Sequence, residues 1–136
     1  MSRAFRLVGA AIMLGSSVFA GTEARAIELT GAWATHEDLC GQVFTKKDNR
    51  VVYAELSDLF GSGFIIDGDR IRGKTGTCTI KSRKEEGNSL ELSAACASSV
   101  MTQDLRFSLK IIDDNNISRS FPEISGMSLN YTRCKL

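Results

Sequence analysis

Two cysteines, Cys78 and Cys96, stand at the far ends of two runs in which apolar and polar residues alternate. A hairpin in which the numbers of opposed residues add up to 174 would place Cys78 opposite Cys96 and Ile80 opposite Ala94. The same register gathers the apolar side chains on one face and the charged ones on the other, and a slip of one residue would lose this agreement. The sequence therefore predicts two long antiparallel strands around a polar loop at Glu85–Ser89.

A second hairpin is expected just before the first, with its turn at Asp67-Gly68, because glycine adopts positive φ without steric cost. Basic residues alternate along the strand after this turn and therefore share one face. The next strand adds two more, with Arg83 opposite Glu91 as a solvated ion pair. These residues predict an outer basic stripe, which is either a solvated face or a patch for an anionic ligand, polymer or acidic partner. The stripe consists of Arg70, Arg72, Lys74, Lys81 and Arg83.

Residues 1–26 have the pattern of a cleaved secretory signal peptide. Arg3 and Arg6 precede an apolar run of 14 residues, and the segment ends in Ala-Arg-Ala, a small-x-small cleavage pattern. We expect cleavage after Ala26, with Ala20 as the alternative. The apolar run is too short to span a bilayer comfortably, and no later stretch approaches a membrane span. The chain is therefore expected to be exported to the bacterial periplasm or secreted.

Cleavage after Ala26 would leave residues 27–136, a chain of 110 residues that suffices for a single domain with one core. The removed segment holds three of the 17 basic residues and one of the 16 acidic ones, so the mature domain carries a net charge of −1. This balance excludes a general polyanion binder. No stretch interleaves aromatic and basic residues as nucleic-acid platforms do. We therefore expect no nucleic-acid partner.

The four cysteines of an exported domain predict two disulfides rather than metal ligation. None of them forms a C-x-x-C pair, and a single histidine, His36, does not complete a zinc set. Four cysteines allow three pairings. The hairpin register favours Cys78–Cys96, which leaves Cys40–Cys134, and the competing pairing is Cys40–Cys78 with Cys96–Cys134.

Short alternating segments recur along the mature chain and are separated by polar turns. The pattern predicts eight to ten strands and at most one or two short helical turns, one of them after Thr35. Regular spacing of this kind is typical of an all-β domain, either a small antiparallel meander barrel or a sandwich. Full closure would leave no exposed sheet edge. Strands outside the two hairpins are expected at 27–34, 42–45, 50–56, 105–111, 117–121 and 127–131.

No constellation of residues points to catalysis. His36 is followed by two acidic residues, but adjacent positions on a helical turn do not face each other, and we expect a solvated histidine. The acidic pairs at 85–86 and 113–114 fall in expected turn tips, where solvation does not suit general acid–base work. Asp67-Gly68-Asp69 lacks the other oxygen ligands of a calcium loop. We therefore expect no enzyme activity, no metal site and no cofactor.

The segment Glu28–Cys40, ELTGAWATHEDLC, has a G-x-W motif followed by a cysteine after a short polar stretch. In this it resembles the start of small bacterial periplasmic lipocalin-like barrels, among them the metalloprotease inhibitors of the alkaline-protease-inhibitor type. The G-x-W motif is shared by many calycin-type barrels. The resemblance implies the barrel fold and assigns no functional residue.

The sequence thus indicates an exported, non-catalytic binding protein of the bacterial periplasm. In the first hypothesis the barrel holds a small ligand in a cavity lined by Trp33, Phe64, Phe107 and Tyr131. In the alternative, the loop at 57–63 or the basic stripe binds a protein such as an envelope hydrolase, which would make the domain an inhibitor or an accessory factor.

Overall fold

The computed structural model describes residue 15 and residues 28–60 and 63–136. The expected signal peptide at 1–26 lies outside the described residues, apart from Gly15. Eight of the described strands form a closed antiparallel barrel, so the predicted meander barrel is confirmed and the sandwich is not the fold. Within the described ranges no helix is both long enough and apolar enough to cross a membrane.

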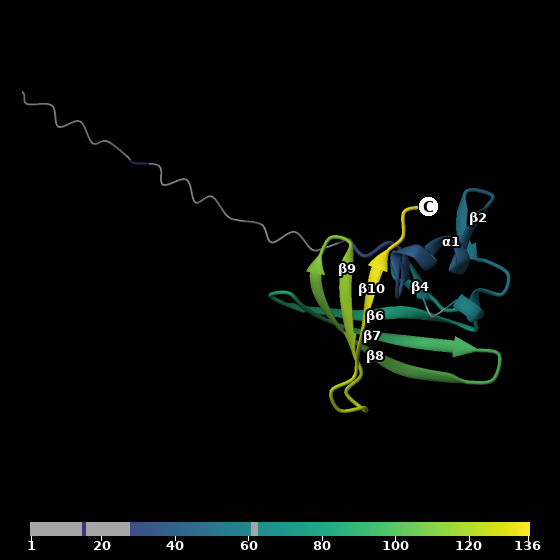
Figure 1. The fold of residues 1–136 in the computed structure, drawn as a ribbon. Helices are drawn as coiled ribbons and strands as arrows, with labels where there is room; N and C mark the ends of the chain where they lie inside the picture. Colours follow the sequence, from purple (N-terminus) through teal and green to yellow (C-terminus); the bar gives the residue numbers. More distant parts are fainter. Residues whose placement is uncertain (1–14, 16–27, 61–62) are drawn as a thin grey trace, which may run out of the picture.

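The strands are short at the start of the domain and longest in its middle (Figure 1). In chain order the elements are β1 (Gly31–Ala34), the 3-10 turn η1 (Glu37–Leu39), α1 (Cys40–Val43), β2 (Phe44–Lys47), β3 (Arg50–Tyr53), the 3-10 turn η2 (Ser57–Phe60), β4 (Gly63–Asp67), β5 (Arg70–Arg72), β6 (Gly76–Glu86), β7 (Ser89–Ser98), β8 (Thr102–Asp113), β9 (Asn116–Ser120) and β10 (Ser128–Arg133).

The barrel runs in sequence order from β4 to β10, and β1 closes it by pairing with both β10 and β4. Because successive strands are antiparallel, their connections alternate between two ends. One end, which we call the turn end, holds the β4–β5, β6–β7 and β8–β9 turns and residues 28–30. The other, which we call the loop end, holds the connections 73–75, 99–101 and 121–127. Figure 1 shows β9 and β10 upright against the flatter run of β6, β7 and β8.

One cluster of apolar side chains fills the barrel interior. Trp33 on β1 is fully buried, and its indole N–H donates a hydrogen bond to the Leu29 carbonyl at 3.0 Å. The other strands contribute their inward-facing positions, as the period of two requires. These residues are Ile66, Ile71, Leu90, Leu92, Leu109, Ile111, Ile117 and Tyr131.

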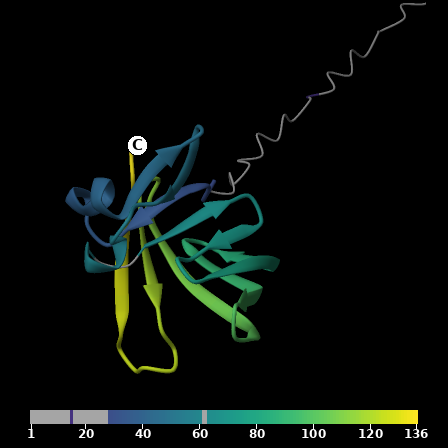
Figure 2. The ribbon, with the colours of Figure 1, turned by 90° about the vertical axis from the view of Figure 1, so that its right-hand side faces the viewer.

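A second cluster lies outside the barrel wall. The chain leaves the meander after β1, forms α1 and the β2–β3 hairpin, and returns at β4. Ala32, Ala34 and Ile65 on the outward faces of β1 and β4 pack against Val43 and Phe44 of this excursion. Figure 2 shows the excursion gathered on one side of the barrel. It therefore covers part of the wall and adds no strand to the barrel.

Both disulfides have the pairing that the sequence favours. Cys78–Cys96 connects the facing strands β6 and β7. Cys40–Cys134 joins the start of α1 to the residue that follows β10, across a sequence separation of 94. The competing pairing is therefore not formed. The second bridge fixes the outer excursion to the end of the last barrel strand.

The predicted register of the β6–β7 hairpin holds only as far as Ile80. A β-bulge at Lys81 then adds one residue to β6, and Arg83 lies opposite Leu92 instead of Glu91. Because such an insertion shifts the pairing by one residue, it turns the following side chains to the other face of the strand. The prediction of an outward Arg83 is therefore wrong.

Two turns also differ from their predicted positions. The β6–β7 turn is the two-residue turn Gly87-Asn88, with Gly87 at φ 59°, and is shorter than the predicted loop at Glu85–Ser89. The β4–β5 turn is Gly68-Asp69, one residue later than predicted, with Gly68 at φ 58°. In both turns the glycine takes the left-handed conformation that most residues avoid.

Candidate functional site

The loop end of the barrel contains a cavity of about 420 Å³. Its floor includes Leu92 and Leu109 of the inner cluster. Its rim includes Val100 and Met101 on the β7–β8 connection, which are 86% and 57% exposed. Pockets that bind small molecules typically measure about 300–1,000 Å³. The cavity therefore has the size of a small-molecule site.

Aromatic side chains form part of the cavity wall. Phe64 and Tyr131 meet edge to face with their ring centroids 4.8 Å apart, and Phe107 contributes from β8. These are three of the four residues proposed from the sequence for a ligand cavity. The fourth, Trp33, does not line it and is fully buried, with the guanidinium of Arg133 4.5 Å from its ring centroid.

Arg119 on β9 also lines the cavity. It pairs with Leu109 of β8 and Leu129 of β10, which belong to the inner cluster or pack against it, so Arg119 is on the inner face. Its guanidinium carbon lies 4.5 Å from the ring centroid of Phe107 and 4.6 Å from that of Phe121. Its Nε atom is buried without a hydrogen-bond partner. The cavity thus combines apolar walls with one cation held beside two rings.

The sequence reasoning missed Arg119, although the chain carries a signal for it. In β9 the apolar phase is set by Ile117 and continues to Phe121 just beyond the strand. Arg119 stands between them in the same phase, where a side chain faces the interior. An unpaired charge is unfavourable at an inward-facing position. An arginine there therefore indicates a candidate functional residue.

A second hollow borders the cavity where β9 leaves β8. The pairing of these strands begins at Ser108 with Ser120, so residues 102–107 of β8 have no partner in β9. The hollow measures about 710 Å³, is lined by charged residues of both signs, and shares Leu105 and Arg119 with the cavity. Arg119 therefore borders both spaces.

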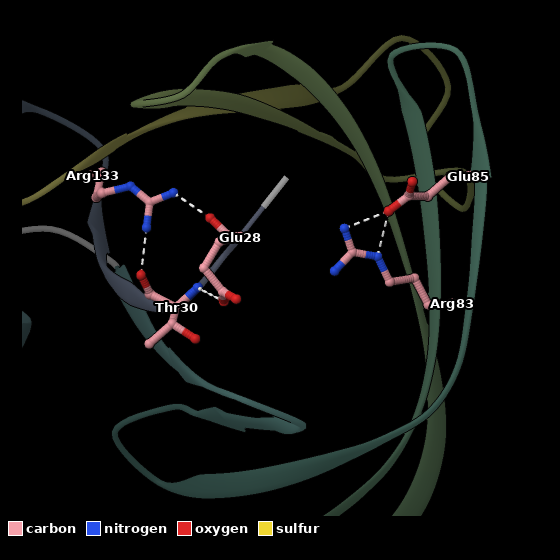
Figure 3. A network of polar contacts seen from close by, with 5 residues as sticks. All are labelled: Glu28, Thr30, Arg83, Glu85 and Arg133. Atoms are coloured by element: carbon pink, nitrogen blue, oxygen red, sulfur yellow. Dashed lines mark hydrogen bonds and ion pairs between the residues drawn. The ribbon is translucent and has the colours of Figure 1, made fainter. Parts of the chain in front are cut away.

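Arg133 lies at the opposite, turn end of the barrel (Figure 3). Its guanidinium donates hydrogen bonds to the carbonyl of Glu28 at 2.6 Å, to that of Thr30, and to that of Asp114 at 3.0 and 3.1 Å. The same group lies over the Trp33 ring. It thereby ties the segment before β1 and the β8–β9 turn to β10.

An ion pair faces Arg133 across the turn end. The β6 bulge brings Arg83 and Glu85 to the inner face, where the guanidinium nitrogens lie 2.5 and 2.6 Å from the carboxylate. Opposite them, the Glu28 carboxylate accepts the Thr30 N–H at 2.9 Å. Hydrogen bonds from Thr30, and then the charges of Arg83 and Arg133, hold the pKa of Glu28 below its usual value. Figure 3 shows the Arg83–Glu85 pair on one side of the turn end, with the guanidinium of Arg83 directed toward Glu28 and Arg133 on the other side.

The five residues of the proposed basic stripe are not brought together on one face. Arg70 on β5 and Lys81 at the bulge are exposed. Arg83 lies on the inner face because the bulge intervenes. The remaining two, Arg72 and Lys74, make contacts with the outer excursion. The barrel wall therefore carries no continuous row of these five cations.

These contacts hold the excursion in place. The Arg72 guanidinium donates to the Val51 carbonyl at 3.1 Å, and Lys74 pairs with Asp58 at 2.6 Å. The hydrogen bond from Lys74 keeps the pKa of Asp58 below its usual value. The Tyr53 hydroxyl lies 3.0 Å from the Arg72 carbonyl oxygen, and burial raises the pKa of Tyr53 to about 12.

The other residues considered for catalysis lie apart from the cavity. His36 is exposed, and Glu85 is in β6 and not in a turn. The Asp113 carboxylate accepts the Asn115 N–H at 2.8 Å and the Asn116 side-chain amide at 2.9 Å, and these bonds hold its pKa low. Asp113 therefore stabilises the β8–β9 turn. Among the described residues no group of three or more His, Cys, Asp or Glu side chains is placed to hold a metal ion.

Comparison with protein families, with curated proteins and with solved structures gives no match to this chain. The likeness of residues 28–40 to periplasmic lipocalin-like barrels therefore stays a prediction. The barrel itself rests on its strand pairing, and the function has to be argued from the cavity.

Proposed function

We propose that this domain is a non-catalytic binding protein that takes a small, largely apolar molecule into the loop-end cavity. The observation that carries the proposal is the space of about 420 Å³ beside Phe64, Phe107 and Tyr131. Protein interiors are normally packed with few voids larger than a water molecule, so a space of this size is not needed for folding. The cavity lies at the loop end, where the exposed Val100 and Met101 border it, so we take the loop end as the entrance.

The rim supports an apolar ligand. Val100 and Met101 border the cavity and expose most of their surface. A ligand that covers them removes apolar surface from water, which contributes about 25 cal/mol per Å². Methionine also adapts its shape to irregular partners. The side chains of Val100 and Met101 would therefore make apolar contacts with a ligand at the mouth of the cavity.

The proposal places the protein in the bacterial periplasm or outside the cell. The two disulfides favour an oxidising compartment. The pattern of residues 1–26 is that of a signal peptide. Expression of the full chain in a bacterium, followed by N-terminal sequencing of the periplasmic product, should give Ile27 as the first residue. Recovery of the uncut chain from the cytoplasm would contradict export.

Binding is tested with the neutral apolar dye N-phenyl-1-naphthylamine, whose fluorescence rises on transfer from water to an apolar site. Gln103 lines the cavity from an exposed position on β8, so Gln103→Trp should fill the mouth and weaken binding roughly tenfold or more. Thr102→Trp is the matched control, because Thr102 is its exposed neighbour and does not line the cavity. Absence of saturable binding to the wild-type protein would overturn the proposal.

A second candidate function is inhibition or assistance of an envelope hydrolase through η2. Leu56, Leu59 and Phe60 expose 66%, 70% and 39% of their surfaces on one short segment. Leu56 also has a positive φ of 58°, which is unusual for a residue with a side chain. Neighbouring exposed apolar residues are typical of surfaces that bind proteins.

This candidate is tested by adding the protein to a secreted bacterial metalloprotease of the alkaline-protease type and following cleavage of a peptide. Inhibition that is lost in Leu59→Ser and kept in Gln103→Trp would favour the protein partner. If protease activity is unchanged at a large excess of the wild-type domain, inhibition of this class of protease is excluded.

A further inference from the structure

Arg119 borders both the cavity and the hollow, and no described residue gives it a hydrogen bond or an ion pair. The inward-facing arginines of the turn end, Arg83 and Arg133, are each bound to oxygen acceptors. The guanidinium of Arg119 instead contacts the rings of Phe107 and Phe121. The Nε–H group of Arg119 is buried and lacks an acceptor, which is unfavourable, so an oxygen acceptor brought by a ligand would be bound there.

The contacts of Arg119 define what kind of acceptor fits. Aromatic rings stabilise the positive charge, but they do not replace oxygen acceptors for the in-plane N–H groups. Arginine presents these N–H groups as a planar fork. Two oxygens on one atom, held in one plane, match two parallel N–H donors of this fork. A carboxylate has this geometry.

The charge of the site favours a carboxylate over a phosphate ester. Among the residues that line the cavity, Arg119 is the charged one, and the other walls are apolar or uncharged. A phosphate monoester would bring a charge of about −1.5 to −2 into this space. Part of that charge would stay unpaired in apolar surroundings, which is unfavourable. A carboxylate brings one negative charge for one positive charge.

We propose that the ligand of this cavity is a monocarboxylate with an apolar body. Its carboxylate binds the guanidinium of Arg119, and its body lies beside Phe64, Phe107 and Tyr131. The inference rests on the proposed binding function and narrows it to one chemical class, whose simplest members are medium-chain fatty acids. Arg119 selects the class of ligand, and the aromatic wall supplies the apolar contact.

The test compares an acid with the alcohol of equal chain length. The disulfide-bonded mature protein, extracted to remove bound lipid, is titrated near neutral pH with decanoate and with decanol by displacement of N-phenyl-1-naphthylamine. The wild-type protein should bind decanoate roughly tenfold or more tightly than decanol, as expected for a pair of charge-assisted hydrogen bonds. Arg119→Met should abolish this preference, so that decanoate and decanol bind with equal affinity once the variant's own dye affinity has been measured and used to convert the displacement. Arg119→Lys keeps the charge without the fork and should retain part of the preference.

Arg106→Met is the matched control, because it removes one positive charge from an exposed residue of β8 that borders the hollow and not the cavity. Its preference for decanoate should equal that of the wild type. Equal affinities for decanoate and decanol in a protein that binds the dye would overturn the inference and leave the proposed function standing. A preference that survives Arg119→Met would also overturn it. Failure of dye, acid and alcohol alike to bind would overturn both.

Discussion

The guanidinium carbon of Arg119 lies 4.5 Å from the ring centroid of Phe107, and no described residue gives this guanidinium an oxygen acceptor. A cation–π contact contributes about 0.5–2 kcal/mol. The buried Nε–H group, which has lost its hydrogen bond to water, costs about 1–3 kcal/mol. The contacts with the rings of Phe107 and Phe121 and this cost are of similar size, so Arg119 gives the free protein little net stability.

The first prediction follows from this relationship. Arg119→Met removes a partly buried charge and keeps an apolar chain of similar length, so the free energy of unfolding of the ligand-free protein should stay the same or rise by about 1–2 kcal/mol. Urea unfolding at neutral pH measures it. A loss of more than about 2 kcal/mol would show that Arg119 has a structural role, because only broken native interactions produce such a loss.

Arg133→Met should have the opposite effect. The wild-type side chain bonds the carbonyls of Glu28, Thr30 and Asp114 and lies over the Trp33 ring. Loss of these contacts should lower the free energy of unfolding by about 2–4 kcal/mol. Dye affinity measured below the unfolding transition should not change, since Arg133 is at the turn end and does not line the cavity. An unchanged free energy of unfolding in Arg133→Met would contradict the role given to Arg133 at the turn end.

The fold was predictable from the sequence where apolar residues mark one face of a strand. The alternation of residues 105–111 and the opposed pair Cys78 and Cys96 predict the antiparallel strands and both disulfides. The bulge at Lys81 was not predictable, because residues 81–86 are polar at every position and no apolar side chain marks the face. The inward positions of Arg83 and Glu85 follow from the bulge and were therefore missed.

The candidate site was predictable only in part. Phe64, Phe107 and Tyr131 occupy apolar phases of their strands, and a closed barrel brings such positions together. The alternation does not tell at which end of the barrel an inward-facing residue lies. For this reason the sequence placed Trp33 in the cavity, whereas its ring packs against Arg133 at the other end. Arg119 was detectable because it stands in the inward-facing phase of β9 with Ile117. A charged residue in such a phase is therefore a candidate binding residue, as the aromatic residues are.

The two disulfides should differ in what they contribute to stability. Cys40–Cys134 spans a sequence separation of 94 and Cys78–Cys96 one of 18. In the chain-entropy account a bridge restricts the unfolded chain more when its loop is longer, which gives about 5 kcal/mol for the first and about 3 kcal/mol for the second. Replacing each pair by alanines and measuring urea unfolding tests this order. An equal or reversed order would contradict the account.

Tyr53 should make the domain less stable in strong alkali. Burial raises the pKa of its phenol from 10.0 to about 12, so the folded protein keeps its proton where the unfolded chain loses it. The stabilisation is complete below pH 10 and is lost as the pH rises toward about 12. Tyr53→Phe should remove this part of the pH dependence in urea unfolding. An absorbance titration of the folded protein in which all tyrosines ionise near pH 10 would contradict it.

The central claim is that the loop-end cavity binds a small apolar molecule. A chemical-shift titration of the isotope-labelled mature protein with N-phenyl-1-naphthylamine tests it most directly. We predict saturable shifts at the amides of Phe64, Met101 and Phe107 and no shifts at Arg133. In Gln103→Trp the same shifts should need a roughly tenfold or higher dye concentration to saturate. Shifts that do not saturate, or that are confined to Leu56–Phe60, would contradict the claim.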